Sequence, residues 1–187
     1  MITHVNASFE RAKERCRALG LKPTSRLITV SIAQQLLGFY SDDCLVKSYV
    51  VSTSRRPPSN VKDSLGTPRG LHEIAEKHGA GQPPGIVFKA RVATGKHFSE
   101  FSPEEQQKHL ITTRILWLGG LERGYNAGTN PAGEVVDTKQ RYIYIHGTNR
   151  EDLLGTPSSI GCIELTNLGV LELFDQVRTK DLVWIEE

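Results

Sequence analysis

A histidine and a cysteine, His146 and Cys162, stand sixteen positions apart in the last third of the chain. A free thiol, with a pKa near 8.5, is mostly protonated at neutral pH, whereas the thiolate is the nucleophile. A histidine within about 3–4 Å can take the thiol proton and later return it to a leaving group. The pair therefore predicts nucleophilic acyl-transfer chemistry, provided that the fold brings the two side chains together.

The neighbouring residues indicate how the pair could meet. The alternating apolar run 142–145 predicts a strand that ends at His146. Gly161 lets the backbone before the cysteine approach a substrate closely. If the turn directs the N–H groups of Gly161 and Cys162 inward, they can stabilise the oxyanion of a tetrahedral intermediate. The other histidine nitrogen needs an acceptor that sets the tautomer, and the carbonyl of Gly147 would suffice.

The whole chain predicts a mainly β fold, sandwich-like, with peripheral helices. Strands are expected at 26–32, 35–40, 45–53, 71–74, 85–93, 111–118, 141–145 and 182–185, and helical segments at 8–19, 102–109 and 167–177. Ser8 is the expected cap of the first helix. Many short strands without a βαβ rhythm favour a β-sandwich. We expect residues 1–24 to form an N-terminal helical appendage and residues 25–187 to form the catalytic domain.

Composition argues against several classes of partner. Of the 187 residues, 38% are hydrophobic and 24% are charged, as in ordinary globular domains. A net charge of +2 is too small to favour nucleic acid or an anionic membrane. Three cysteines without CxxC spacing predict neither a disulfide framework nor a zinc site. No further ligand is spaced near His146 and Cys162, so we expect neither a metal nor another cofactor.

The N-terminus bears on location. The first twenty residues carry charged Glu, Arg and Lys side chains at six positions and lack the apolar core of a secretory signal. No later run approaches the roughly 18–20 apolar residues of a membrane span. We expect a cytoplasmic protein, or a periplasmic or cell-envelope protein if a leader has been removed from the chain.

The segment that contains the pair resembles the catalytic domain of the L,D-transpeptidases, the YkuD family (also called ErfK/YbiS). The HGT at 146–148 resembles the histidine motif of the family, and SIGCIE at 159–164 resembles its Ser-His-Gly-Cys motif. The GTPRGLH at 66–72 is similar to the TPxGxF/H stretch of the family, and 115–122 is similar to its strand and loop before the active site. The resemblance covers about residues 25–187.

The resemblance implies roles for three residues. Cys162 is then the nucleophile, His146 the base, and Gly147 the backbone acceptor that orients the histidine. The family cleaves the bond between residue three and D-Ala four of peptidoglycan stem peptides through a thioester. The acyl group then passes to an amine of another stem, which crosslinks, or to water, which trims.

Further residues are expected to contact the substrate: Ser159, Ile160, Glu164 and His72. His72 belongs to the TPxGxH stretch, which flanks the cleft in the family, although a packing or surface role is an open alternative. Ile160 replaces a His or Lys of the family, and Glu164 replaces its usual Arg or Asn. Losing a cation and gaining an anion should raise the thiol pKa. We interpret the two departures as a changed substrate or acceptor preference.

The function expected first is that of a cysteine-dependent L,D-transpeptidase-family enzyme acting on stem peptides or muropeptides. One alternative is a cytoplasmic L,D-carboxypeptidase that trims recycled muropeptides, because the N-terminus shows no export signal. Another is a murein-peptide binding module without catalysis, because of Ile160 and Glu164. A carbapenem adduct on Cys162 is expected from the β-lactam reactivity of the family.

Overall fold

The computed structural model describes residues 2–187, with side chains from residue 7 onward. The strands are β1 (Arg26–Ser31), β2 (Leu36–Ser41), β3 (Cys44–Val50), β4 (Gly70–His78), β5 (Ile86–Lys89), β6 (Val92–His97), β7 (Ile111–Gly120), β8 (Tyr144–Thr148), β9 (Ile163–Leu165) and β10 (Leu182–Glu186). The helices are α1 (Ile2–Ala18), α2 (Pro103–Gln106) and α3 (Asn167–Gln176), with 3-10 turns η1 (Phe98–Glu100) and η2 (Glu151–Leu153). In the described part of the chain, no helix is long and apolar enough to cross a membrane.

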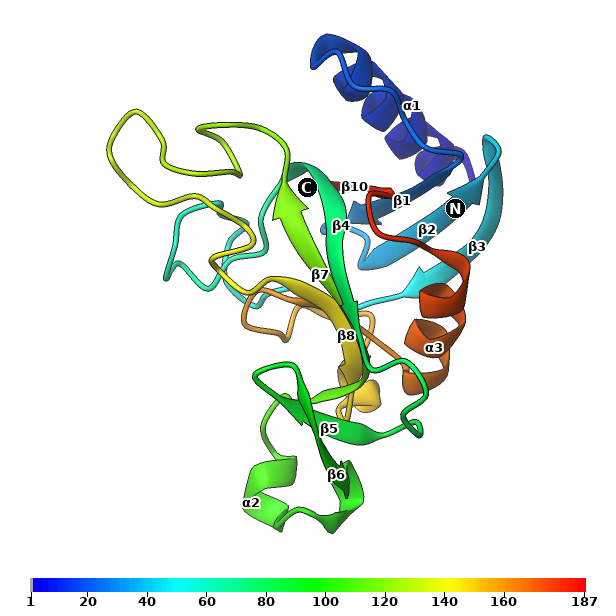
Figure 1. The fold of residues 1–187 in the computed structure, drawn as a ribbon, viewed down its shortest axis with the longest axis vertical. Coiled ribbons are helices and arrows are strands. Elements are labelled where there is room, and N and C mark those ends of the chain that lie inside the picture. Colours follow the sequence, from blue (N-terminus) through cyan, green and yellow to red (C-terminus); the bar gives the residue numbers. More distant parts are fainter. Residues whose placement is uncertain (1) are drawn as a thin grey trace.

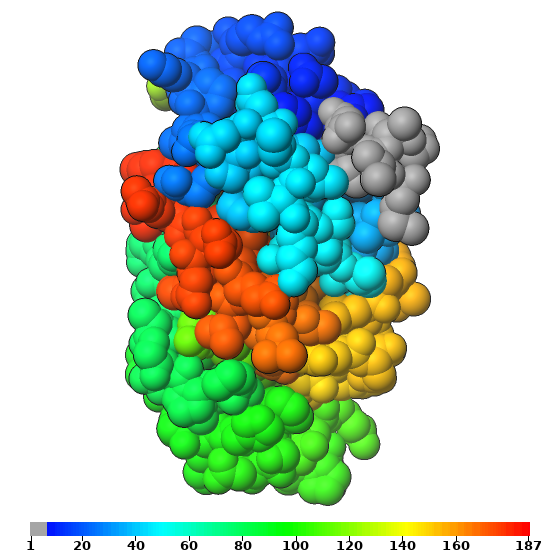
Figure 2. All heavy atoms as spheres, turned by 90° about the vertical axis from the view of Figure 1, so that its right-hand side faces the viewer, coloured from blue at the N-terminus to red at the C-terminus, as the bar shows by residue number. Residues whose placement is uncertain are grey.

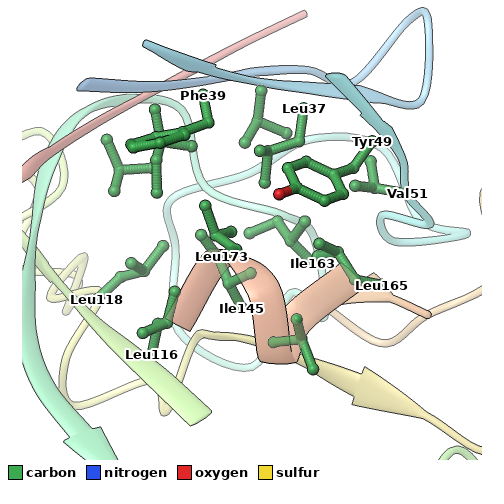
Figure 3. Close-up of a cluster of buried hydrophobic side chains, with 14 of the residues drawn as sticks. Leu37, Phe39, Tyr49, Val51, Leu116, Leu118, Ile145, Ile163, Leu165 and Leu173 are labelled. Atoms are coloured by element: carbon green, nitrogen blue, oxygen red, sulfur yellow. The ribbon is translucent and has the colours of Figure 1, made fainter. Parts of the chain in front are cut away.

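The predicted fold class is confirmed: the chain is mainly β, with peripheral helices and an N-terminal helix (Figure 1). Within residues 2–187 the strands form a ten-stranded sheet in the order β3-β2-β1-β10-β4-β7-β5-β6, and β8 and β9 continue it from β7. The sheet curls, so that strands β1 to β3 face strands β7 to β9 across the core (Figures 1 and 3). The two faces thus pack as the layers of a sandwich do.

The main core lies between the two facing parts of the sheet and is closed by α3. Leu37 and Phe39 of β2 point toward Leu116 of β7 and Leu173 of α3, and all four side chains are at most 2% exposed (Figure 3). Truncating a buried leucine to alanine typically costs about 2–5 kcal/mol. This core therefore holds β7 and β8 rigidly, and β8 carries the histidine of interest.

Helix α1 covers the opposite face of β1 and lies across one end of the molecule (Figure 2). Phe9 stacks on Tyr40 with ring centroids 4.3 Å apart, and Cys16 is fully buried in the same cluster. Strand β1 therefore buries both faces: Leu27 points to α1 and Ile28 to the main core. This double burial accounts for the nearly continuous apolar run in β1.

Several predicted boundaries were wrong. Helix α1 begins at Ile2, so Ser8 lies inside the helix, is only 3% exposed and cannot be its cap. The strand expected at 85–93 is a hairpin, β5 and β6, whose turn residues Ala90 and Arg91 have φ angles of 48° and 69°. Such turns usually contain Asn-Gly or Asp-Gly, and this one lacks that signal.

A third boundary concerns the candidate histidine. The strand expected at 141–145 is observed as β8, Tyr144–Thr148, because Tyr142 has a φ of 57° and ends a turn. His146 consequently lies in the middle of a strand instead of at its end. It is paired with Ile115 of β7 on one side and with Glu164 of β9 on the other.

Candidate active site

A cavity of about 530 Å³ opens beside β8 and the segment that leads into β9. Four residues singled out from the sequence line it, namely His146, Ile160, Cys162 and Glu164. The structure therefore brings the histidine and the cysteine to one shared space. Among the side chains of residues 7–187, no group of three or more His, Cys, Asp or Glu residues is placed to hold a metal ion.

His146 is held in one tautomer by its own strand. The ring is 2% exposed, and its Nδ1 lies 2.8 Å from the carbonyl oxygen of Gly147. Since a carbonyl can only accept, Nδ1 carries the proton and Nε2 keeps a lone pair. Burial lowers the pKa of His146, against the opposing effects of the Glu164 charge and the Gly147 hydrogen bond. The imidazole is therefore neutral at neutral pH and able to accept a proton.

Cys162 follows a glycine in an unusual conformation. Gly161 has a φ of 129°, which side-chain-bearing residues rarely adopt. The Sγ of Cys162 accepts the N–H of Tyr144 at 3.4 Å. Removal from water raises the thiol pKa to about 12; Glu164 adds to the rise, whereas the Tyr144 N–H and Arg141 oppose it. The resting cysteine is thus a protonated thiol, and the effect of Glu164 has the direction expected from the sequence.

The turn before the cysteine is shaped by Ser159. Its hydroxyl donates to the carbonyl of Cys162 at 2.7 Å and accepts the N–H of Gly161 at 3.2 Å. The side chain of Ser159 is buried, 1% exposed, and does not line the cavity. The predicted substrate contact of Ser159 is therefore corrected to a role in the turn. The N–H of Gly161 is also engaged here, which leaves the N–H of Cys162 as the candidate oxyanion donor.

The TPxG segment docks onto the same turn. The hydroxyl of Thr67 donates to the carbonyl of Gly161 at 3.0 Å and accepts the N–H of Ser54 at 2.9 Å. Both contacts are buried. The segment thus contributes to the site by holding the turn in place.

His72 does not reach the cavity, and its predicted substrate contact was wrong. The ring is 0% exposed, with Nδ1 3.0 Å from the carbonyl oxygen of Gly70 and Nε2 3.1 Å from the hydroxyl of Thr138. Burial lowers its pKa to about 4. Strand β4 lies inside the sheet between β10 and β7, so the side chain faces protein on every side. His72 is a packing residue.

Glu164 has a partner that the sequence did not reveal. Its carboxylate is buried, 1% exposed, with oxygens 2.9 and 3.1 Å from the Nδ1 of His109. A buried carboxylate needs a compensating group. The sequence could therefore have indicated that Glu164 needs a partner. It could not identify His109, which lies 55 positions away, before β7.

Two arginines at the cavity were also missed. Arg141 donates to the carbonyls of Ser59 and Gly66, at 2.8 and 2.6 Å, and its charge lowers the pKa of Cys162. Arg91 donates to the hydroxyl of Tyr144 at 3.0 Å. The cavity wall therefore holds fixed cations as well as the Glu164 anion.

Comparisons with known proteins identify the family and the fold. The model of the YkuD family, described as the L,D-transpeptidase catalytic domain, matches residues 25–185. An L,D-transpeptidase from Mycobacterium smegmatis superposes with a TM-score of 0.50 at 18% identity, over 87% of this chain and 59% of that one. L,D-transpeptidase 3 from Mycobacterium tuberculosis, with a faropenem-derived adduct, gives a TM-score of 0.53 at 13% identity, over 87% and 60% of the two chains.

At these identities the structural likeness shows the fold alone. The chain spans about 60% of the length of the two solved chains. No curated protein matches it in sequence. The family is therefore shown by the match of residues 25–185.

Proposed function

The chain belongs to the YkuD family of L,D-transpeptidase catalytic domains, and we propose that it is a cysteine acyltransferase acting on peptidoglycan stem peptides. It cleaves the bond between stem residue three and D-Ala four and passes the acyl group to an amine or to water. One observation carries the proposal: Cys162 shares a cavity with His146, whose Nδ1 is bound to Gly147 so that Nε2 can accept a proton.

The first half of the reaction forms a thioester. The Nε2 of His146 takes the proton of the Cys162 thiol as the sulfur attacks the carbonyl carbon of stem residue three. The carbon–sulfur bond forms, and the carbonyl electron pair moves to the oxygen, where the N–H of Cys162 stabilises it. The intermediate then expels D-Ala: its carbon–nitrogen bond breaks, and the leaving nitrogen takes the proton from His146.

The second half releases the acyl group. His146 takes a proton from the acceptor, an amine or a water molecule, as the acceptor attacks the thioester carbon. The carbon–sulfur bond breaks, and the sulfur regains the proton. Because the pKa of Cys162 is raised to about 12, the thiol is the resting form, and proton transfer to His146 must accompany the attack.

The charges of the cavity support a peptide substrate. Arg91 and Arg141 can attract a carboxylate, and Glu164 lies on the same wall. Stem peptides carry carboxylates and an amine, so both signs of charge have counterparts in such a ligand. This complementarity fits a substrate preference changed by Ile160 and Glu164, and it does not require loss of catalysis.

The assignment is tested by substituting the thiols one at a time. Wild type, Cys162→Ala and Cys44→Ala are incubated with a muropeptide tetrapeptide, and the products are identified by mass. Cys44 is an exposed free cysteine outside the cavity, so its variant is the matched control. We expect D-Ala release by wild type and Cys44→Ala and none by Cys162→Ala. Release that persists in Cys162→Ala would contradict the proposal.

The same products separate the possible outcomes. A free tripeptide indicates water as acceptor and hence L,D-carboxypeptidase activity, whereas a crosslinked dimer indicates transpeptidation. Binding of the tetrapeptide without any product by wild type would instead support the binding module. We also expect a penem or carbapenem adduct on Cys162 by intact mass, as a faropenem-derived adduct is present in the mycobacterial structure.

A further inference from the structure

The negative charge of Glu164 has no role in the proposed steps of proton and acyl transfer, yet it lies close to the residues that carry them out. Glu164 is the register partner of His146 in the parallel pair β8–β9. Its side chain lines the same cavity as Cys162. The negative charge of Glu164 acts on both groups, raising the pKa of His146 and that of Cys162. A carboxylate there disfavours the thiolate, so whatever compensates it affects the nucleophile.

The compensating group is His109. Its Nδ1 contacts both oxygens of Glu164, at 2.9 and 3.1 Å. Within the described side chains this is the ion pair that Glu164 makes. Histidine carries a charge only when it is protonated. The neutralisation of Glu164 therefore depends on the protonation of one side chain.

Other charged groups near the pair have fixed partners or lie elsewhere on the cavity wall. Arg150 follows β8 and feels the Glu164 charge, but it forms its own ion pair with Asp152 at 3.0 Å. Asp152 in turn feels the charge of His109. From the remaining elements, Arg91 and Arg141 line the cavity, and Arg141 is bound to backbone carbonyls. None of these groups replaces His109 at the carboxylate.

We propose that His109 is a positioning residue for the thiol chemistry and acts through Glu164. Protonated His109 holds the carboxylate as a neutral pair, whereas neutral His109 leaves a full negative charge beside Cys162 and His146. The inference rests on the proposed role of Cys162 as the nucleophile. It adds a residue of the same cavity wall that adjusts how readily the thiol loses its proton.

The size of the effect follows from thiolate chemistry. A change of one pKa unit alters the thiolate fraction about tenfold, but the more basic thiolate is also the better nucleophile. The net change in the rate of thiol modification is therefore about threefold per unit. A difference of this size is readily measured, and it needs no substrate of the enzyme.

The test measures modification of Cys162 by a pyridyl disulfide from pH 5 to pH 9, read as the mass of the peptide containing Cys162. His109→Gln keeps a polar side chain without charge, and His109→Lys keeps a cation throughout this range. We expect His109→Gln to be about threefold slower than His109→Lys at the same pH throughout this range, because only the lysine variant keeps a cation beside Glu164. At each pH the rate of wild type should lie between those of the two variants.

The double variant decides whether the effect runs through Glu164. In a Glu164→Gln background, adding His109→Gln should change the rate by less than about 1.5-fold, since no carboxylate remains to be neutralised. An equal slowing in both backgrounds, or wild-type rates for His109→Gln at every pH, would overturn the proposal. Thermal unfolding of each variant checks the fold. The modification rates could behave as expected while neither wild type nor any variant releases D-Ala. That result would contradict the proposed function and leave the effect of His109 on Cys162 supported.

Discussion

Two regions of the molecule each bury one glutamate and one histidine, and they treat these residues differently. Where β4 meets α1, Glu122 accepts the N–H of Leu71 at 2.7 Å and forms an ion pair with Arg15. Both ring nitrogens of His72, the next residue along β4, are engaged as well. Every partner there is a backbone group, a hydroxyl or a permanently charged arginine.

In the cavity wall the same residue types are only partly bound. Glu164 depends on the titratable His109, and the hydrogen bond that holds His146 among the described side chains is made by Nδ1. The comparison teaches that burial and residue type do not identify a chemical site. The cavity differs because its polar groups can still exchange a proton: His146 keeps a lone pair on Nε2, and the partner of Glu164 is a titratable histidine.

The largest expected effect is on stability, at Glu122. Glu122→Ala leaves the buried N–H of Leu71 without an acceptor and removes the partner of Arg15. We expect the free energy of unfolding to fall by about 2–4 kcal/mol, after discounting the ion pair because the arginine is 42% exposed. Denaturant unfolding followed by circular dichroism measures the change. A loss below about 1 kcal/mol would break the comparison.

The next effect is a pH dependence of stability at His72. Its pKa is lowered from 6.5 to about 4 in the folded protein, so the unfolded chain binds the proton first as pH falls. The stability contribution is therefore present above pH 6.5 and is lost through pH 4, by about 3 kcal/mol. Unfolding free energies of wild type and His72→Gln should converge across this range. A pH-independent difference between the two proteins would contradict the assignment.

Glu164 should behave in the opposite way to Glu122. Glu164→Ala opens onto an existing cavity and leaves a histidine that can become neutral, so we expect a stability loss of at most about 1 kcal/mol. Its clear effect should be on the sulfur, with a lower pKa of Cys162 and faster thiol modification below pH 12. Unfolding and modification are measured on the same preparation as Glu122→Ala. A stability loss equal to that of Glu122→Ala would remove the distinction between the two regions.

The smallest effect is expected at Ile160, whose side chain is 54% exposed at the cavity. Ile160→His introduces a group that becomes cationic below about pH 6.5. The pKa of Cys162 should then fall slightly, raising the modification rate about twofold on the acidic side only. Ile160→Gln is the uncharged control. The same acceleration in both variants would attribute the change to access to the sulfur.

Much of the fold followed from local pattern. The helix expected at 167–177 is observed at Asn167–Gln176, and the strand expected at 182–185 is observed at Leu182–Glu186. These segments have strong periodicity and ordinary ends. The Ala90-Arg91 turn was missed because its backbone conformation is imposed by the pairing of β5 with β6 and carries no typical turn residues.

The candidate site was predictable only where its residues are close in sequence. His146 and Cys162 belong to one short stretch, and both reach the same cavity. The contact between His109 and Glu164 depends on the register of β7, β8 and β9, which is a non-local property. For His72 the substrate contact was predicted from its place in the TPxGxH stretch. Membership of a motif, however, does not indicate where a side chain points.

The backbone at Gly161 has a consequence for how this protein could diversify. With a φ of 129°, and with Ile143 only 3.2 Å from where a Cβ would stand, this position resists exchange. The sulfur is consequently placed by a backbone turn, which the side chains of Ser159 and Thr67 hold. Residues 160 and 164 can therefore be exchanged to suit a new ligand while the sulfur of Cys162 keeps its position.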